Sequence, residues 1–412
     1  MSLQIESNAR AGRAAGPAPL LDIGFRPFFL LGGLYAAIGI AAWVASLSGA
    51  LPLPASWPSL FWHGHEMLFG FAAAVISGFL LTAVPGWTGT QRVRGAWLAI
   101  LVAAWLLGRL ALWLAGLLPP AAVALLDLLH LPLLTFFVAR PVYLAGKAQN
   151  YAFPVLLSLL FAANLLVHGE ILGLWSGTAR FGLVMGTYAV VLMVTIIGGR
   201  VVPAFTRNAL RRRGQQADVQ SSELFKSAAM IAMLIAMTLE LLLLTPWSAR
   251  PLFFASGIAS LSTALLLLLR ARGWRVERTL GEPIVWVLHA GQAWLVVAFL
   301  IGGLSRFIPA VPGNTAFHAL SAGAIGTMTI AFMTRAALGH TGRPLQASPA
   351  IVLAYGLVIG GAAVRVLLPM AFPQLYRELL IASGTLWAGG FAIYSVVFFP
   401  ILTGPTLEAE PG

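Results

Sequence analysis

Cysteine is missing from this 412-residue chain, and charged side chains make up only 9% of it. Without cysteine the protein has no disulfide, no thiolate metal site, no iron-sulfur cluster and no covalent haem attachment through a Cys-x-x-Cys-His motif. Any bound metal must therefore use histidine, carboxylate, methionine or tyrosine. Soluble globular proteins carry charge on about a quarter of their residues, so the low charge and a hydrophobic fraction of 59% exclude a water-soluble enzyme.

The sequence also lacks a P-loop and a dinucleotide-binding glycine motif, so nucleotide chemistry has no support. The 25 Lys and Arg exceed the 13 Asp and Glu and give a net charge of +12. In a soluble protein this excess would suggest a nucleic-acid partner. Here the basic residues lie in short connections between apolar runs, so they indicate membrane topology, and no nucleic-acid partner is expected.

Apolar runs that are long enough to cross a membrane recur along the whole chain. A helix needs about 20 apolar residues to cross a hydrocarbon layer of about 30 Å. The sequence therefore predicts an all-α polytopic membrane protein with a single twelve-helix domain over residues 1–404, including an N-terminal arm (1–25), and a short C-terminal tail (405–412). The predicted spans are 28–48, 62–84, 95–117, 121–139, 152–174, 180–202, 223–245, 250–270, 283–304, 315–337, 347–369 and 377–399.

The distribution of basic residues predicts the orientation of these spans. The N-terminal arm and alternate loops carry most of them, with the largest cluster between Arg207 and Lys226. Because positively charged loops stay in the cytoplasm, we expect both termini on the cytoplasmic side. The first 22 residues contain no apolar stretch before a cleavage site, so no removable signal peptide is predicted.

An internal repeat marks the inner ends of three spans. Similar octets follow the second, sixth and tenth spans, each with Thr at the seventh position and a ring at the sixth: Thr82–Gly89, Arg200–Arg207 and Arg335–Gly342. The first, fifth and ninth spans each open near a proline: Pro27, Pro154 and Pro283. Both marks have a period of four helices, which predicts three arcs of four helices around a pseudo-threefold axis. A two-half transporter would instead repeat after six.

Two histidines occupy the same place in this repeat. His65 precedes Thr82 by 17 residues, and His318 precedes Arg335 by 17 residues. Both therefore lie at one depth near the outer face, on the second and tenth spans. Two imidazoles that face each other across a bundle are what a six-coordinate haem iron needs, so we expect His65 and His318 to be the ligands of a haem.

Two arginines inside the spans also match in the repeat. Arg109 and Arg365 lie in the outer thirds of the third and eleventh spans, with Glu240 as the equivalent in the second arc. Arginines within a membrane are costly and usually functional. We expect these two to bind the haem propionates through bidentate hydrogen bonds.

The motif His63-Gly-His65-Glu66 predicts a second site. Residues i and i+2 of a helix point about 200° apart, so His63 and His65 must face different pockets. Glu66 could orient a ring or relay protons. The side that His63 faces would then hold a second metal, and an imidazole-rich site without cysteine suits copper.

Other histidines within the spans supply candidate copper ligands. We expect His130 and His168 to join His63, with Asp127 either orienting the His130 ring from the same helix face or forming a simple buried pair with it. His289 is an alternative ligand or a helix-packing histidine. A hydrogen-bonded structural role remains the alternative for each of them.

Several of these segments resemble the NnrS family over nearly the whole chain. They are Phe25–Phe29, Trp62–Met67 with its continuation to Pro85, Gly199–Asn208, His289-Ala-Gly, and His318 through Leu338–Arg343. The resemblance implies a bacterial inner-membrane protein that carries haem b and copper and is associated with denitrification and with resistance to nitric oxide. It implies no agreed reaction.

The twelve-helix, three-arc plan also looks like the catalytic subunit of haem-copper oxidases and nitric oxide reductases, in which the second and tenth helices hold the low-spin haem. Those enzymes place copper histidines on helices 6 and 7, and the corresponding spans here contain none. An oxidase-type binuclear centre is therefore not expected.

Three functions follow from these features. The first is a haem- and copper-binding protein that protects against nitric oxide by binding it or nitrosylated iron, or by electron transfer from an unidentified donor. The second is a nitric oxide reductase-like enzyme, and the third is a secondary transporter, against which the four-helix period counts. The sequence identifies no catalytic residue.

Overall fold

The computed structural model describes residues 19–407 except 55 and 217, and all regular secondary structure in this part of the chain is helical. Twelve helical stretches are long and apolar enough to cross a membrane, so the prediction of an all-α, twelve-span protein is confirmed. A helix satisfies its own backbone hydrogen bonds in lipid, which is why runs this apolar form helices. Most of the predicted N-terminal arm (1–18) and the end of the tail (408–412) lie outside the described residues.

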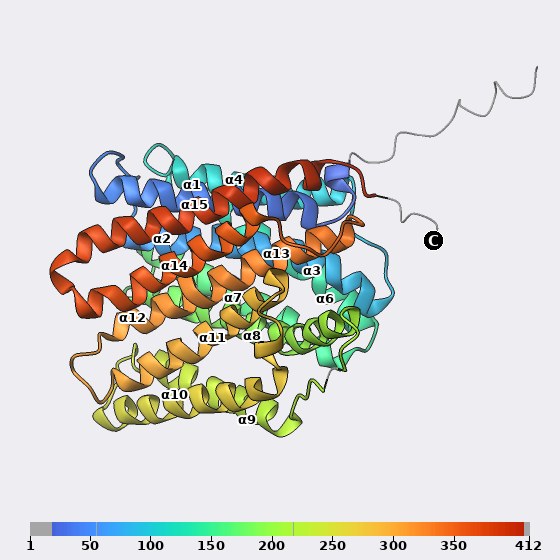
Figure 1. Ribbon diagram of the computed structural model, residues 1–412. Coiled ribbons are helices and arrows are strands. Elements are labelled where there is room, and N and C mark those ends of the chain that lie inside the picture. Colours follow the sequence, from blue (N-terminus) through green and yellow to red (C-terminus); the bar gives the residue numbers. More distant parts are fainter. Residues whose placement is uncertain (1–18, 55, 217, 408–412) are drawn as a thin grey trace, which may run out of the picture.

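The spans are numbered 1–12 in chain order (Figure 1). Single helices form nine of them: α1 (Phe25–Leu47), α4 (Ala96–Trp113), α7 (Ala152–Ile171), α8 (Thr178–Arg212), α9 (Glu223–Leu242), α10 (Arg250–Ala271), α11 (Pro283–Leu304), α14 (Pro349–Ala371) and α15 (Tyr376–Thr403). Span 2 combines α2 (Ser59–His65), η2 (Glu66–Ala72) and α3 (Ala73–Thr88); span 4 combines α5 (Pro120–Leu128) and α6 (His130–Leu144); span 10 combines α12 (Gly313–His318), η6 (Ala319–Ile325) and α13 (Gly326–His340). Short 3-10 turns accompany them: η1 (Pro19–Leu21), η3 (Ala148–Asn150), η4 (Arg272–Trp274), η5 (Val276–Arg278) and η7 (Pro373–Leu375).

Both ends of the described chain meet at one end of the bundle, on the right in Figure 1. The Arg26 guanidinium at the start of α1 donates to the backbone carbonyls of Leu402 (2.9 Å), in the last turn of the last span, and of Gly404 (2.6 Å), just after it. We call this the terminal end and the other the distal end. An even number of spans requires both termini to lie on the same side.

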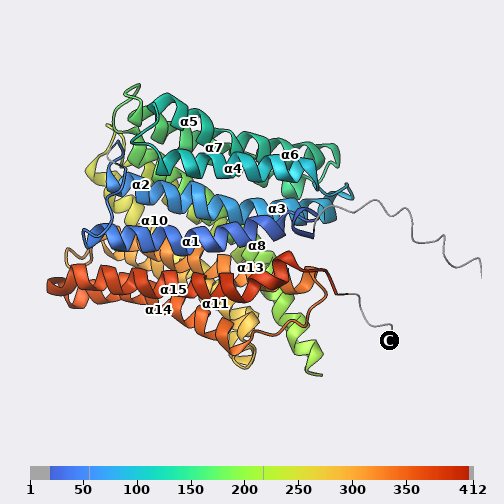
Figure 2. The same ribbon diagram turned by 90° about the horizontal axis from the view of Figure 1, so that it is seen from above.

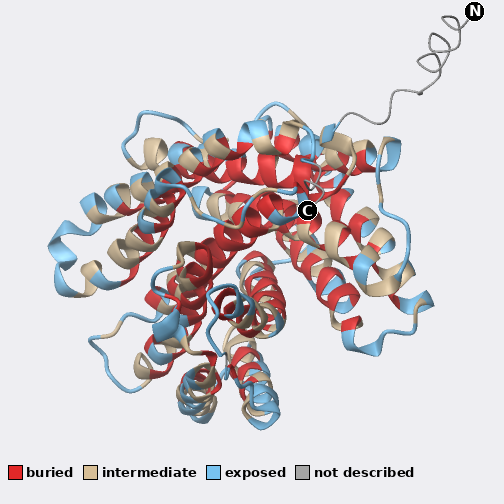
Figure 3. Ribbon diagram, turned by 45° about the vertical axis from the view of Figure 1, so that its right-hand side comes forward, coloured by how far each residue is buried: buried red, intermediate tan, exposed pale blue. Residues whose placement is uncertain are grey.

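The contacts between helices repeat every four spans. Spans 2, 6 and 10 touch one another, and span 12 packs along span 1 in the way that span 4 packs along span 5 and span 8 along span 9. Figure 2 shows the ring closing where α1 lies beside α15. Buried residues concentrate toward the middle of the assembly (Figure 3). These neighbours agree with three arcs of four helices around a central trio.

The opening prolines also follow the repeat. Pro27, Pro154 and Pro283 all lie within the first three residues of α1, α7 and α11. A proline in the first turn costs little, because its missing N–H would have had no partner within the helix. The predicted mark at the start of spans 1, 5 and 9 is confirmed.

A wider π-helical turn interrupts two of the three central spans at the same place. The segments η2 and η6 each have seven residues, and they begin directly after His65 and His318. In span 6, α8 continues as an α-helix through the equivalent depth. Because π turns are rare and often accompany functional sites, the two histidines mark the distal parts of spans 2 and 10 as the region to inspect.

Candidate metal and cofactor sites

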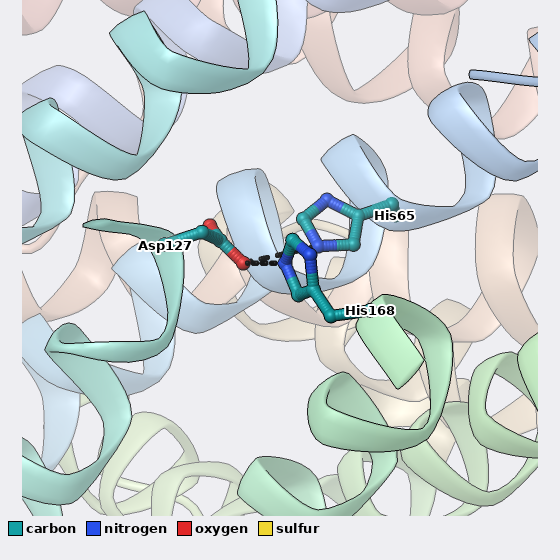
Figure 4. A group of neighbouring side chains, drawn as sticks. All are labelled: His65, Asp127 and His168. Carbon is teal, nitrogen blue, oxygen red and sulfur yellow. Dashed lines mark hydrogen bonds and ion pairs between the residues drawn. The ribbon is translucent and has the colours of Figure 1, made fainter. Parts of the chain in front are cut away.

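A fully buried polar cluster lies in the first arc, near the distal end. His65 of α2, Asp127 of α5 and His168 of α7 each offer one ligand atom, and these atoms lie within 4.8 Å of one another (Figure 4). The Asp127 Oδ2 atom is 3.1 Å from His65 Nε2 and 2.9 Å from His168 Nε2. Three spans thus bring two imidazoles and a carboxylate to one point.

A second layer of polar side chains surrounds this group. Arg109 of α4 donates to both Glu66 and Asp127 through separate nitrogens. Tyr35 of α1 donates its hydroxyl to the other oxygen of Glu66. Asn164, one turn before His168 on α7, donates to Asp127 Oδ2 at 2.7 Å. Each carboxylate is therefore held by several donors at once.

The charges of this cluster do not balance if both of its carboxyl groups are ionised and its imidazoles are neutral. Glu66 and Asp127 would then supply two negative charges against the one positive charge of Arg109. Both ring nitrogens of His65 face oxygen atoms: Nδ1 faces Glu66 Oε1 at 2.8 Å, and Nε2 faces Asp127 Oδ2 and the Asn164 side-chain oxygen. A neutral imidazole has one N–H, so only one of these nitrogens can donate. Either a second proton on the ring or a monovalent cation bound by its other nitrogen would neutralise the excess negative charge.

A cavity of about 420 Å³ lies on the other side of span 2. Apolar and aromatic side chains form most of its wall, which is typical of cofactor and small-molecule sites. Spans 1, 2, 6, 10, 11 and 12 line it, with the residues Ile40, Trp43, Leu60, His63, Gly64, Met67, Leu68, Phe71, Ala72, Leu183, Thr187, Asn314, Phe317, His318, Ser321, Ala322, Ile325, Gly361, Arg365, Tyr376, Leu380, Ser383, Gly384 and Trp387.

Two imidazoles of this cavity are held in defined orientations. His318 Nδ1 donates to the backbone carbonyl of Asn314 at 3.1 Å, and its Nε2 accepts from Arg365 Nη2 at 3.1 Å. The His63 ring stacks on Trp43, with ring centroids 4.5 Å apart and planes 15° apart. His63 Nδ1 is buried and has no hydrogen-bond partner among the residues that the structure describes. In His318 the nitrogen Nε2 is therefore bonded only to Arg365, and in His63 the nitrogen Nδ1 is available for a ligand.

The family model described as "NnrS protein" matches residues 19–406. The chain belongs to the NnrS family. A search of curated proteins found no significant match.

The structure of this NnrS-family chain does not bring His65 and His318 together as expected. His318 shares its cavity with His63, whereas His65 lies in the polar cluster of the first arc. The two histidines occupy equivalent depths, but their helices turn them toward different spaces. Equal depth alone therefore does not place two residues in one pocket.

The two arginines follow the same rule. Arg109 contacts the cluster of His65, and Arg365 contacts His318. The predicted equivalence of Arg109 and Arg365 thus holds in space, but they do not flank one pocket. In the remaining arc, Glu240 pairs with Arg306 at 2.5 Å. The position of Glu240 thus also lies in a contact with an arginine, but that arginine follows span 9 and belongs to the third arc.

His130 does not join the group expected for copper. Its Nδ1 lies 3.2 Å from the Leu101 carbonyl and its Nε2 lies 2.9 Å from Ser77 Oγ. Leu129, between α5 and α6, keeps helical dihedral angles, but Asp127 bonds to side chains of spans 2, 3 and 5 and does not orient His130. His130 has the hydrogen-bonded structural position that was its alternative.

His289 lies away from both sites. It is in the second turn of α11, at the terminal end, and its Nε2 is 2.9 Å from Thr206 Oγ1. Two members of the cluster, Asn164 and Tyr35, were not identified from the sequence. The spacing of four between Asn164 and His168 places both on one helix face and could have found the former. Tyr35 belongs to an otherwise apolar helix, and no spacing indicates its partner.

Proposed function

We propose that this NnrS-family protein binds haem b and copper in the bacterial inner membrane and protects the cell against nitric oxide. The observation that carries this proposal is the pair His63 and His318, which reach one largely apolar cavity from spans 2 and 10. The protein would lie with its terminal end in the cytoplasm, as the excess of basic residues in the loops at that end favours. This orientation puts both candidate sites near the outer face.

The residues of the cavity fit a haem with two histidine ligands. An imidazole that binds a metal usually donates its other N–H to a carbonyl or carboxylate, and His318 does so toward Asn314. His63 has a buried nitrogen without a partner, and Trp43 fixes its ring plane. Arg365 is close enough to hold a propionate once it leaves His318. Bound haem would supply an iron that accepts nitric oxide or passes single electrons.

The polar cluster of the first arc fits a copper ion. His65 and His168 provide imidazole ligands, which copper favours, and Asp127 provides a carboxylate. If Glu66 and Asp127 are both ionised, one negative charge remains beyond that balanced by Arg109, and one Cu(I) ion would neutralise it. Glu66 and Asn164 keep His65 and Asp127 in place around it, as outer partners of metal ligands do.

The separation of the two sites bears on the reaction. A binuclear reductase centre needs both metals in one cavity, but these candidate sites lie on opposite sides of span 2. This arrangement, and spans 6 and 7 without histidine, favour nitric oxide binding or electron transfer over reductase chemistry of the oxidase type. A likeness to haem-copper oxidases stays a prediction.

An absorption spectrum of the purified, dithionite-reduced protein tests the haem. We expect a Soret band, which a secondary transporter would lack. His63→Ala and His318→Ala should each remove the low-spin signal, because each takes away an iron ligand. His289→Ala, at the other end of the bundle, is the matched control and should keep it. A wild-type spectrum in both His63→Ala and His318→Ala would refute the assignment.

Elemental analysis tests the copper site independently of the haem. His65→Ala and His168→Ala should lower the copper content at least several-fold and keep the low-spin haem. His130→Ala serves as the control, since it removes an equally buried imidazole that has its own partners outside the cluster. Copper that survives in both cluster variants, or that disappears with His130→Ala alone, would contradict the proposed ligand set.

A further inference from the structure

The side chain of Arg270, near the terminal end of α10, is buried inside the bundle, whereas basic side chains that follow it in the sequence are exposed. Its side chain is 3% exposed, whereas Arg272 and Arg278 are exposed as expected for basic residues near a membrane surface. The guanidinium lies against the backbone of α8 at Gly199, where any side chain beyond hydrogen would collide with it. Glycine at 199 is therefore what admits the arginine.

The buried guanidinium has almost no hydrogen-bond acceptor. Its Nη2 donates to the Thr195 carbonyl at a long 3.4 Å, and its Nε and Nη1 are buried without partners in the described part of the chain. No ion pair among residues 19–54, 56–216 and 218–407 includes Arg270. Of the glutamates in the adjoining segments, Glu223 pairs with Lys226, Glu282 pairs with Arg212, and Glu277 is exposed. An arginine stays charged in proteins, and a buried charge without a counter-charge is strongly unfavourable.

A second unpartnered donor lies one turn further along. Trp274 is 1% exposed, and its indole Nε1 is buried without a partner. The Arg270 Cζ atom is 5.3 Å from the centroid of the Trp274 ring, and that ring is also next to His289 at 6.3 Å. Two neighbouring side chains thus present three buried donors and no acceptor, between spans 6, 8 and 9.

We propose that Arg270 and Trp274 bind one small monovalent anion, a halide or a planar oxyanion such as nitrite or nitrate. One guanidinium carries one positive charge and so balances a monovalent anion, and its planar pair of N–H donors matches a planar oxyanion. The tight contact with Gly199 excludes bulky anions. The site lies at the opposite end of the bundle from the candidate metal sites and does not depend on their occupancy.

Anion-dependent stability of the purified, full-length protein tests the site. Thermal unfolding is followed in chloride, nitrite or nitrate, with gluconate as the bulky anion, at constant ionic strength. A ligand that binds only the folded state raises the midpoint in a saturable way, so we expect a saturable rise with at least one of the three small anions and none with gluconate. Arg270→Gln should weaken the apparent affinity at least tenfold.

Two further variants separate binding from general effects of salt. Trp274→Phe keeps the ring but removes the N–H, and it should weaken the affinity several-fold. Arg200→Gln is the matched control on span 6, since Arg200 already donates to Asn150 Oδ1 at 2.9 Å, and it should keep the wild-type response. An equal response in wild type and Trp274→Phe would overturn the role of the indole.

A direct observation keeps the proposal testable if Arg270→Gln fails to fold. Bromide replaces chloride in crystals of the wild-type protein, and its anomalous signal should appear beside Arg270. The anion site is refuted if no bromide lies at this position and none of the three small anions raises the midpoint of thermal unfolding above its value in gluconate. The donors of Arg270 and Trp274 would then bind water.

Discussion

Replacing Arg109 by methionine should destabilise the protein more than any ordinary surface change. Arg109 is 5% exposed and is the arginine that contacts both Glu66 and Asp127. Methionine preserves much of its length and volume but leaves both carboxylates buried beside each other. Removing one partner of a buried ion pair typically costs about 3–5 kcal/mol, and here a single change uncouples two carboxylates. We therefore expect a loss of about 3–5 kcal/mol in the free energy of unfolding.

Reversible unfolding in mixed detergent and dodecyl sulfate micelles, followed by tryptophan fluorescence, measures this loss. Combining Arg109→Met with Glu66→Gln and Asp127→Asn removes the carboxylate charges while keeping their shapes, so most of the stability should return. The exposed Arg180 provides the matched control, and Arg180→Met should change stability by less than about 0.5 kcal/mol. A loss below about 1 kcal/mol for Arg109→Met, or a triple variant no more stable than the single one, would refute the charge argument.

Two other predictions concern how the ring of helices is closed and packed. Arg26→Met should lower the free energy of unfolding by about 3 kcal/mol, because hydrogen bonds from a buried charge contribute about 1.5–3 kcal/mol each. Amide exchange at residues 402–407 should also accelerate, and unchanged exchange there would mean that Arg26 does not hold this segment in place. Gly182→Ala places a Cβ 2.5 Å from the Ala163 carbonyl oxygen, so overpacking should cost about 1–3 kcal/mol in the same unfolding assay. Gly356→Ala meets open space and should be neutral or stabilise the helix by up to about 1 kcal/mol; equal losses at both glycines would show that packing is not the cause.

The sequence predicts the spans of this protein well because a membrane imposes a length and a composition on every helix. The four-helix period could also be recognised, because octets and prolines recur at fixed positions along the chain. Depth follows from such counting at about 1.5 Å per residue. The direction in which a side chain faces does not follow from it. For this reason the sequence predicts His65 beside His318 and His63 beside His168, whereas the structure has His63 beside His318 and His65 beside His168.

The partners of Asp127 illustrate a second limit. Asp127 and His130 lie three residues apart on a span whose helical dihedral angles continue through Leu129, yet they have different hydrogen-bond partners. The actual partners come from spans 2, 3 and 5, at separations in sequence of 18 to 62 residues. Such contacts depend on which arcs adjoin and on how each helix is rotated, and neither property is encoded in local spacing.

The order in which the spans leave the ribosome separates the two candidate sites in time. The cluster of His65, Asp127 and His168 draws only on spans 1 to 5, so it can assemble once His168 has been inserted. The cavity of His63 and His318 has walls from spans 1, 2 and 6 and from spans 10 to 12, and it closes only when α15 packs against α1. At about 5–20 residues per second, completing the chain from His168 to Thr403 takes on the order of ten to fifty seconds. A large cofactor bound in this cavity would therefore have an open side through which to enter during synthesis, and packing of the last helix would enclose it.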